Sequence, residues 1–447
     1  MTPRSTTVYV CSNCDAQYPK WVGRCSQCGK FGTVPTQASV VSPSQSQPLA
    51  AGPATTVSLG SMVNSEVKRL ATGWNEVDRV LGGGLVEGSV LLLTGEPGVG
   101  KSTLLLALAD KCGPTLYASG EESAEQVSAR LKRLGLQGKQ LSFTACHEVA
   151  AVATTAGQTK PALVIIDSLQ TMTTAAEAGA SGSPGQARAV VSALVALAKA
   201  SGAAVVVVGH VTKEGVAAGP KAVEHLVDVV LTLEGAAQQS LRFLRASKNR
   251  FGSSDEVGVF QMAENGLVEV QNPSALFLAE RHHGAGSCIT ALVEGSRSLL
   301  VEVQALVTRS RFSSPKRATT GFDVNRLQLL LAVLSERAGV RLSWSDVYVN
   351  LAGGFKSREP ALDLAVAMAV ASATLKKPLP IDLVVFGEIG LGGEVRPVAA
   401  TERRLQEASR LGFKQALIAG LPVNTKVPAG LALAEVKSVA EAVEWMR

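Results

Sequence analysis

The segment Gly95-Glu-Pro-Gly-Val-Gly-Lys-Ser102 constrains the fold of this 447-residue chain more than any other feature. It has the pattern of a phosphate-binding loop, because it follows the apolar run Val90–Thr94 and precedes the helical run Thr103–Ala109. Glycines in such a turn let backbone N–H groups face phosphate oxygens at the start of a helix. We therefore predict an ATP site in which Lys101 reaches the β- and γ-phosphates and Ser102 holds Mg²⁺. Its members are Gly95, Glu96, Pro97, Gly98, Val99, Gly100, Lys101, Ser102 and Thr103.

Short β-branched runs alternate with Ala- and Leu-rich helical patterns from about Val67 to Val270, which predicts a parallel sheet covered by helices. Besides Val90–Thr94, the expected buried strands are Thr115–Ser119, Leu163–Asp167, Ala204–Gly209 and Val227–Leu233. The third of these runs is apolar up to Asp167, so we expect the strand to deliver that carboxylate to Mg²⁺. The alternative is that Asp167 only caps a helix.

ATP hydrolysis also needs a group that orients or deprotonates water. Glu121 follows the strand predicted after the P-loop helix, and its carboxylate would lie beside the γ-phosphate if the two strands are neighbours. Glu122 competes for this role, and both could instead lie on a surface helix. His210 ends a later strand and could sense the γ-phosphate, or it could be structural.

Four of the seven cysteines form two Cys-x-x-Cys knuckles with ten residues between them, at Cys11, Cys14, Cys25 and Cys28. This spacing allows four thiolates to bind one tetrahedral ion and leaves no open coordination position, so we predict a structural Zn²⁺ site. A pair of disulfides or a redox site is the alternative and fits a reducing cytosol poorly. Basic and aromatic residues surround the knuckles: Lys20, Trp21, Arg24 and Lys30.

Composition divides the chain. Residues 1–34 hold the zinc module; residues 35–66 form a linker that carries no charged residue from Pro35 to Ser61; residues 67–271 form the ATPase domain. Residues 272–447 form a second α/β or α+β domain, with strands expected at Ala275–Ala279, Cys288–Glu294 and Leu299–Val307. We expect a soluble, cytoplasmic protein, since no apolar stretch approaches membrane-spanning length and the amino terminus lacks a signal-peptide core. The net charge of +6 permits a polyanionic partner without requiring one.

The run from Thr72-Gly-Trp74 through Leu81-Gly-Gly-Gly-Leu85 to the P-loop resembles the RecA/DnaB superfamily of hexameric or filamentous ATPases. With Lys248-Asn-Arg-Phe-Gly252 and the zinc knuckles, nearly the whole chain except the linker closely resembles the bacterial RadA (Sms) DNA repair family. The resemblance implies a RecA-like parallel-sheet ATPase domain in a homo-hexameric ring. It also implies a DNA-stimulated motor (helicase or branch migration) on single-stranded and branched DNA in recombination, with the RecA recombinase as partner.

In that family the Lys-Asn-Arg-Phe-Gly segment resembles a finger that reaches the nucleotide of a neighbouring subunit. Two cations separated by one residue on a strand point to the same side, so Lys248 and Arg250 could contact one triphosphate. An exposed basic hairpin or a DNA contact is the alternative. The resemblance also implies that two loops line a DNA channel: Thr171–Gln186, with Arg188 beyond it, and Lys213–Lys221.

The C-terminal domain resembles the proteolytic domain of Lon, through Glu359-Pro-Ala-Leu-Asp363 and Gly387-Glu-Ile-Gly-Leu-Gly-Gly-Glu-Val-Arg-Pro397. Aligned on these motifs, Ala361 stands where the nucleophilic serine would be and Glu402 where the catalytic lysine would be. Neither residue can perform the role of a Ser–Lys dyad, so we expect an inactive, Lon-like scaffold and not a peptidase. Its basic residues could face DNA or be solvated: Arg309, Arg311, Lys316 and Arg317.

Two other functions stay open on the residues alone. One is an ATP-dependent protease, which Ala361 and Glu402 oppose. The other is a regulatory P-loop ATPase with a protein partner and no nucleic acid.

Overall fold

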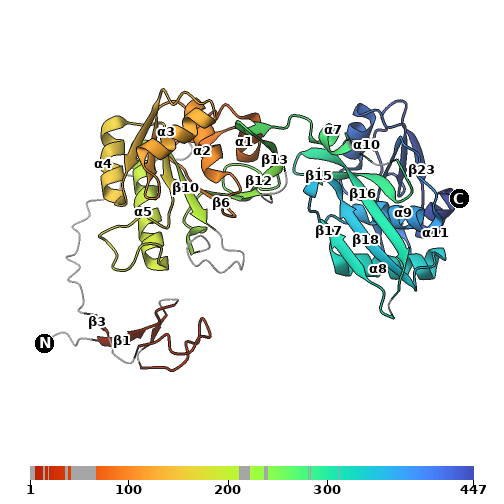
Figure 1. The fold of residues 1–447 in the computed structure, drawn as a ribbon, viewed down its shortest axis with the longest axis horizontal. Coiled ribbons are helices and arrows are strands. Elements are labelled where there is room, and N and C mark those ends of the chain that lie inside the picture. Colours follow the sequence, from red (N-terminus) through yellow and green to blue (C-terminus); the bar gives the residue numbers. More distant parts are fainter. Residues whose placement is uncertain are drawn as a thin grey trace.

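A computed structural model describes residues 6–13, 16–18, 20–35, 39–41, 67–210, 222–235, 240–279, 281, 283–311 and 313–446. Two large sheets dominate it, one in each half of the main body (Figure 1). A small three-stranded sheet near the amino terminus has the order β2 (Gln17–Tyr18), β1 (Thr6–Val10) and β3 (Ser39–Val41). No helix in the described parts of the chain is long and apolar enough to cross a membrane.

The first large sheet has nine strands, and the P-loop strand lies at its centre. The order is β14 (Gly266–Glu269), β13 (Val257–Ala263), β12 (Leu241–Asn249), β11 (Val229–Glu234), β6 (Val90–Gly95), β10 (Ala204–His210), β9 (Leu163–Asp167), β7 (Thr115–Ser119) and β8 (Leu141–Ala145). The six strands from β11 to β8 are parallel, whereas β12, β13 and β14 are antiparallel. The prediction of parallel strands on either side of the P-loop is confirmed.

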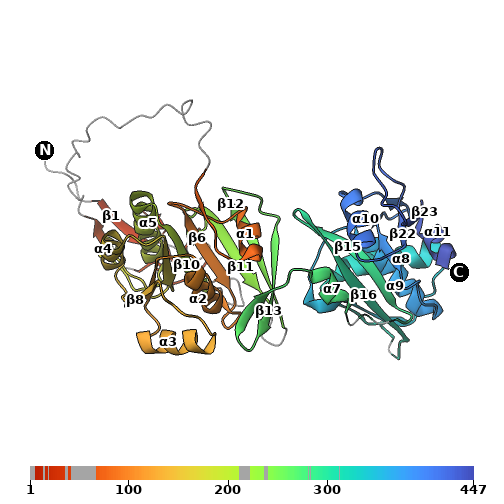
Figure 2. The same cartoon turned by 90° about the horizontal axis from the view of Figure 1, so that it is seen from above.

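Helices cover both faces of this sheet, which explains why its central strands are apolar throughout. Leu91 and Leu93 pack on the side of α2 (Lys101–Lys111) and α3 (Ala124–Arg133). Val90 and Leu92 pack on the side of α4 (Val149–Thr159) and α5 (Pro184–Ser201), and Figure 2 shows the two groups of helices on opposite sides. A short helix, α1 (Asn75–Leu81), and the pair β4 (Arg69–Leu70) and β5 (Leu85–Val86) precede the P-loop strand.

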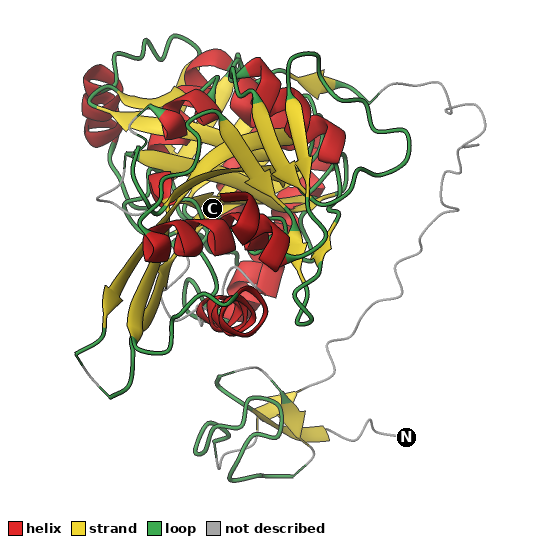
Figure 3. Cartoon of the chain, turned by 90° about the vertical axis from the view of Figure 1, so that its right-hand side faces the viewer, coloured by secondary structure: helices red, strands yellow, loops and turns green. Residues whose placement is uncertain are grey.

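The second sheet has the order β17 (Arg317–Thr320), β18 (Ser345–Leu351), β16 (Arg297–Arg309), β15 (Ser287–Glu294), β19 (Leu383–Phe386), β22 (Gln415–Ile418) and β23 (Ala432–Glu435). Its accessory pair is β20 (Glu388–Ile389) and β21 (Val395–Arg396). The apolar residues of α8 (Val324–Ala338), α9 (Leu362–Leu375) and α11 (Val439–Met446) join one core cluster, and those of α10 (Thr401–Arg410) join another. Figure 3 shows these helices and strands by type.

One expected strand is wrong. Residues Ala275–Ala279 lie in a helix, α7 (Pro273–Leu278), because Asn272 caps it. The Asn272 Oδ1 accepts a hydrogen bond from the Ala275 amide at 3.1 Å, and Pro273 occupies the first turn, where its missing N–H costs nothing. The strands expected at Cys288–Glu294 and Leu299–Val307 are confirmed as β15 and β16.

The two halves share a continuous core. Phe243 of β12 meets Phe355 edge-on with ring centroids 5.4 Å apart, and both belong to one buried cluster. An ionic junction accompanies it: the buried Glu76 of α1 accepts hydrogen bonds from Arg297 of β16 at 3.1 Å. The sheets are therefore joined by packed side chains as well as by the chain between them.

Candidate active site and metal centre

The P-loop bridges the carboxyl end of β6 and the first turn of α2. Gly95, Gly98 and Gly100 have φ values of 151°, 78° and 112°, and a Cβ at Gly95 would lie only 2.5 Å from the Leu233 carbonyl oxygen. Glycine is thus required at Gly95 for both conformation and space. The amino end of α2 has no side-chain cap, so its first N–H groups suit phosphate oxygens.

Lys101 lies inside this loop with 4% of its surface exposed. Its Nζ donates to the carbonyl oxygens of Gly95 at 2.8 Å and Glu96 at 3.0 Å. Burial lowers the pKa of Lys101, while the nearby carboxylates of Asp167 and Glu121 oppose that shift. These residues fit a bound nucleotide, because an anionic phosphate would compensate the charge of a buried ammonium that donates to two backbone carbonyls.

Strand register brings the other predicted residues to the same edge of the sheet. His210 is paired with Gly95, and Asp167 is paired with Ser119 at the end of β7. Since parallel strands end at a common edge, the P-loop, Asp167 and the residues after Ser119 gather there. The strand that precedes Glu121 is not a direct neighbour of the P-loop strand, since β9 and β10 lie between them.

Tyr117 is a site residue that the sequence analysis missed. Its hydroxyl donates to Asp167 Oδ2 at 2.6 Å, and burial together with the Asp167 charge raises the pKa of Tyr117. The hydrogen bond fixes one carboxylate oxygen of Asp167 and leaves the other for a metal-bound water or a metal. The available signal was a tyrosine among aliphatic residues, two positions before the end of a buried strand.

The two candidate glutamates have different surroundings. Ser168 Oγ donates to Glu121 Oε1 at 2.5 Å, and His210 Nε2 lies 3.7 Å from the same oxygen. The Glu122 carboxylate instead accepts two hydrogen bonds from the Arg130 guanidinium, one of them at 2.9 Å from Nη1. Glu122 is thereby neutralised in a bidentate pair, whereas Glu121, with 42% of its side chain exposed, lies beside Asp167 and His210 and can meet solvent.

Arg250 lies toward the amino ends of the parallel strands, whereas the P-loop lies at their carboxyl ends, and Lys248 lies between the two levels. Lys248 pairs with Val230, which also pairs with Leu92, the third of the six residues of β6. The P-loop begins three residues further along at Gly95, an offset of roughly 10 Å along the strand direction at a rise of about 3.3 Å per residue. Arg250 lies beyond the end of β12, where its Nη1 contacts Asp228 Oδ1 at 3.2 Å.

These two cations are also used differently. Lys248 Nζ donates to the carbonyl oxygens of Glu224 at 2.9 Å, His225 at 3.4 Å and Val227 at 2.7 Å. The Arg250 side chain remains 56% exposed. Arg250 is therefore available to a neighbouring molecule, whereas Lys248 stabilises the turn beside it.

One of the two loops assigned to DNA is described. Within Thr171–Gln186, the side-chain oxygen of Gln186 accepts a hydrogen bond from the Thr174 N–H at 2.9 Å, and its side-chain Nε2 donates to the Thr174 carbonyl at 3.1 Å. These two hydrogen bonds connect the loop to the start of α5. Arg188 is exposed on the next turn. The other loop, Lys213–Lys221, lies outside the described residues.

Three of the four predicted zinc ligands gather at one point. The Sγ atoms of Cys11, Cys25 and Cys28 lie within 4.8 Å of one another, and those of Cys11 and Cys28 are 3.8 Å apart. With Zn–S bonds of about 2.3 Å, tetrahedral geometry gives about 3.8 Å between sulfurs, whereas a disulfide would need about 2.05 Å. The geometry fits Zn²⁺ and not a Cys11–Cys28 disulfide. The fourth predicted ligand, Cys14, lies outside the described residues.

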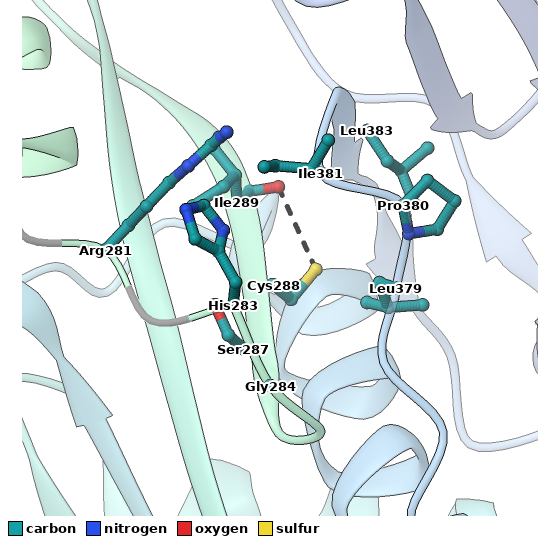
Figure 4. A pocket seen from close by; sticks show the side chains of 10 residues that line it. All are labelled: Arg281, His283, Gly284, Ser287, Cys288, Ile289, Leu379, Pro380, Ile381 and Leu383. Carbon is teal, nitrogen blue, oxygen red and sulfur yellow. Dashed lines mark hydrogen bonds between the residues drawn. The ribbon is translucent and has the colours of Figure 1, made fainter.

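The Lon-like half places Ala361 at the start of α9, fully buried, and Glu402 in the first turn of α10. A cavity of about 200 Å³ lies elsewhere in this half, between the start of β15 and the segment before β19. Figure 4 shows Arg281 and His283 on one wall and Leu379, Pro380 and Ile381 on the other, with the buried Cys288 between them. Neither Ala361 nor Glu402 lines it.

A P-loop on the central strand of the sheet, carboxylates at the ends of the parallel strands β9 and β7, and a cysteine cluster define a P-loop ATPase with a zinc ribbon. Three family models match separate segments: an AAA domain over residues 61–216, a rubredoxin metal-binding domain over residues 9–35, and the ChlI subunit of Mg-chelatase over residues 326–420. ATP with Mg²⁺ and Zn²⁺ are accordingly the ligands of these sites.

Curated relatives match the chain along nearly its whole length. The DNA repair protein RadA of Pseudomonas aeruginosa is 45% identical, with 99% of each chain covered. The proteins of the same name from Escherichia coli and Bacillus subtilis are 43% and 42% identical, covering 97% and 98% of both chains. The chain belongs to the RadA family.

Two solved structures each match less than half of the chain. The RadB recombinase is 23% identical and covers 45% of this chain and 100% of its own, with a TM-score of 0.36. A KaiC-like protein from the archaeon Pyrococcus horikoshii is 18% identical and covers 46% of this chain and 100% of its own, with a TM-score of 0.37.

Proposed function

We propose that this protein is a DNA-stimulated ATPase that acts as a ring-shaped motor, in helicase or branch-migration reactions, on recombination intermediates during DNA repair. Membership of the RadA family supports the repair role. The observation that carries the motor assignment is the position of the exposed Arg250, which lies toward the amino ends of the parallel strands while the P-loop lies at their carboxyl ends. Such a cation can serve the nucleotide of another subunit far more easily than its own.

The chemistry follows from the residues at the P-loop edge. Lys101 would balance charge on the β- and γ-phosphates, and Ser102 and Asp167 would hold Mg²⁺, which screens the phosphate charge. Glu121 would accept the proton of, or orient, the attacking water. Ser168 donates to the Glu121 carboxylate, and His210, which is paired with Gly95 in the sheet, would sense the γ-phosphate.

Arg250 would stabilise the charge that develops on the γ-phosphate across a subunit interface. Lys248 would reach a nucleotide only by leaving the carbonyl oxygens of Glu224, His225 and Val227, so its main contribution in the resting state is to hold the segment that carries Arg250. A homo-hexameric ring, the arrangement that the family resemblance implies, gives every P-loop such a neighbour.

Single-stranded and branched DNA would pass along the loops Thr171–Gln186 and Lys213–Lys221. The first offers small residues and the exposed Arg188, so its grip would be electrostatic and indifferent to sequence. The exposed Arg309, Arg311 and Lys316 would add contacts from the C-terminal half, alongside the more hydrogen-bonded Arg317. The partner in recombination would be the RecA recombinase, in the cytoplasm.

The C-terminal half would act as a scaffold and not as a peptidase. Ala361 has no hydroxyl, and Glu402 no amine, for a Ser–Lys dyad. The nearby Ser357 and Lys376 cannot replace them, since they lie before and after α9, a helix of 14 residues and about 21 Å.

The direct test is the rate of ATP hydrolysis with and without single-stranded DNA at low salt. We expect DNA to stimulate turnover severalfold, with retention of the protein on DNA that falls steeply as salt rises. Turnover that ignores DNA, together with no DNA retention, would instead indicate a regulatory ATPase with a protein partner. ATP-dependent degradation of casein would revive the protease alternative.

A further inference from the structure

The zinc module exposes aromatic and basic side chains that the ATPase mechanism does not use. Phe31 is 75% exposed and Trp21 is 49% exposed, although both belong to a small module in which apolar surface is scarce. Exposed apolar groups that are rimmed by polar residues mark interaction sites.

A short antiparallel hairpin holds these rings in place. Arg24 and Phe31 face each other across it, and the flanking Gly32 amide donates to the Gly23 carbonyl at 3.1 Å. The hairpin turn contains Cys25 and Cys28, so zinc binding fixes the backbone that carries the aromatic face. Trp21 is fixed separately, because its indole N–H donates to the Val34 carbonyl at 3.0 Å.

Cations accompany the rings. The Arg24 guanidinium carbon lies 5.2 Å from the centroid of the Phe31 ring, and Arg24 Nε donates a hydrogen bond to the Gly29 carbonyl. Lys20 and Lys30 are also exposed on this module. From residue 1 to Ser61 the sequence holds four cations (Arg4, Lys20, Arg24 and Lys30) and one acid, Asp15, so the amino-terminal segment is basic while its tether is neutral.

We propose that this face, formed by Lys20, Trp21, Arg24, Lys30 and Phe31, is a binding site for single-stranded nucleic acid separate from the ATPase ring. Bases stack on exposed aromatic rings, and cations beside the rings follow the phosphate backbone. The net positive charge of the segment attracts a polyanion, and exposed rings beside cations suit the unpaired bases of a single strand. The site would give the proposed motor a second DNA contact. Its biological role rests on that proposed function, whereas its ability to bind nucleic acid does not.

The test uses the full-length, zinc-loaded protein without nucleotide and a fluorescein-labelled oligothymidylate of about 30 nucleotides. Phe31→Ala should weaken binding about tenfold, the loss of one stacked base, while Phe31→Tyr retains near-normal affinity. Val423→Ala, at an exposed apolar residue of the C-terminal half, is the control and should bind as the unmodified protein does. Zinc content measured in every variant separates loss of the face from loss of the fold.

Photo-crosslinking locates the contact. A benzoylphenylalanine in place of Phe31 should crosslink to the oligonucleotide, and it should do so equally in a Lys101→Ala background, where the motor cannot hydrolyse ATP. The proposal would be overturned if Phe31→Ala bound the oligonucleotide with unchanged affinity and no crosslink formed at position 31. A protein would then be the expected partner of this face. Failure of DNA to stimulate hydrolysis, with the crosslink intact, would count against the motor alone.

Discussion

At the scale of single residues, the two adjacent glutamates after β7 differ in the partners of their carboxylates: Glu122 accepts from Arg130, and Glu121 accepts from Ser168. Glu121 and Glu122 are adjacent and chemically identical, so no pattern could separate them. Their difference comes from Arg130, in the second turn of α3, which pairs with Glu122, and from Ser168, 47 positions after Glu121 in the chain. Tyr117 was missed for the same reason, since its bond to Asp167 joins two strands that only the sheet makes neighbours.

We predict opposite outcomes for the two glutamates. Glu121→Gln should bind ATP normally and hydrolyse it at least about a hundredfold more slowly, because the amide cannot accept a proton from water. Glu122→Gln is the matched control and should lose less than about threefold, since Glu122 is neutralised by Arg130. Phosphate release under saturating ATP and DNA measures both. A large loss in Glu122→Gln with Glu121→Gln active would transfer the role.

At the scale of elements, most helices and strands follow from periodicity, and the exception has a local cause. Residues Ala275–Ala279 are apolar enough for a strand, yet the cap from Asn272 and the first-turn Pro273 select a helix. The ionic contact between the two halves could not be predicted from the sequence, because Glu76 and Arg297 are 221 positions apart. Apolar patterns fix which face of an element is buried, but not which distant element covers it.

The junction gives a stability prediction. Arg297→Ala should destabilise the protein by about 3 kcal/mol, because it leaves the Glu76 carboxylate buried with fewer partners. Arg396→Ala is the control, since its pair with Glu394 is exposed on both sides and should contribute little. Urea unfolding followed by circular dichroism would measure the two midpoints. Equal midpoints would mean that the junction does not hold the halves together.

The zinc ribbon gives a second prediction at this scale. Cys25→Ser and Cys28→Ser should each lower bound zinc toward zero and unfold the module, whose core of Cys11, Cys25 and Val34 is too small to stand alone. The nine-stranded sheet should stay folded, because its own core does not include these residues. Atomic absorption and proteolysis of the amino-terminal segment measure the two effects. Full zinc retention in the double variant would refute the four-cysteine site.

At the scale of the whole molecule, the sheet separates the P-loop from Arg250. The P-loop lies at the carboxyl ends of the parallel strands, and the antiparallel strand β12 returns the chain to their amino ends. The sequence suggested a finger only through the family resemblance and the spacing of two cations. The antiparallel return of β12 supplies the physical reason why a single subunit would not complete its own site.

The most direct measurement of this central claim mixes two inactive variants, Lys101→Ala and Arg250→Ala. Lys101→Ala lacks the P-loop cation but keeps its finger, whereas Arg250→Ala should bind ATP and DNA nearly normally yet hydrolyse poorly, since the finger acts mainly in the transition state. If Arg250 acts across an interface, mixed assemblies should regain part of the normal turnover wherever an intact P-loop meets an intact finger. Mixtures as inactive as either parent, despite demonstrated subunit exchange, would contradict the account and assign Arg250 to its own subunit or to DNA.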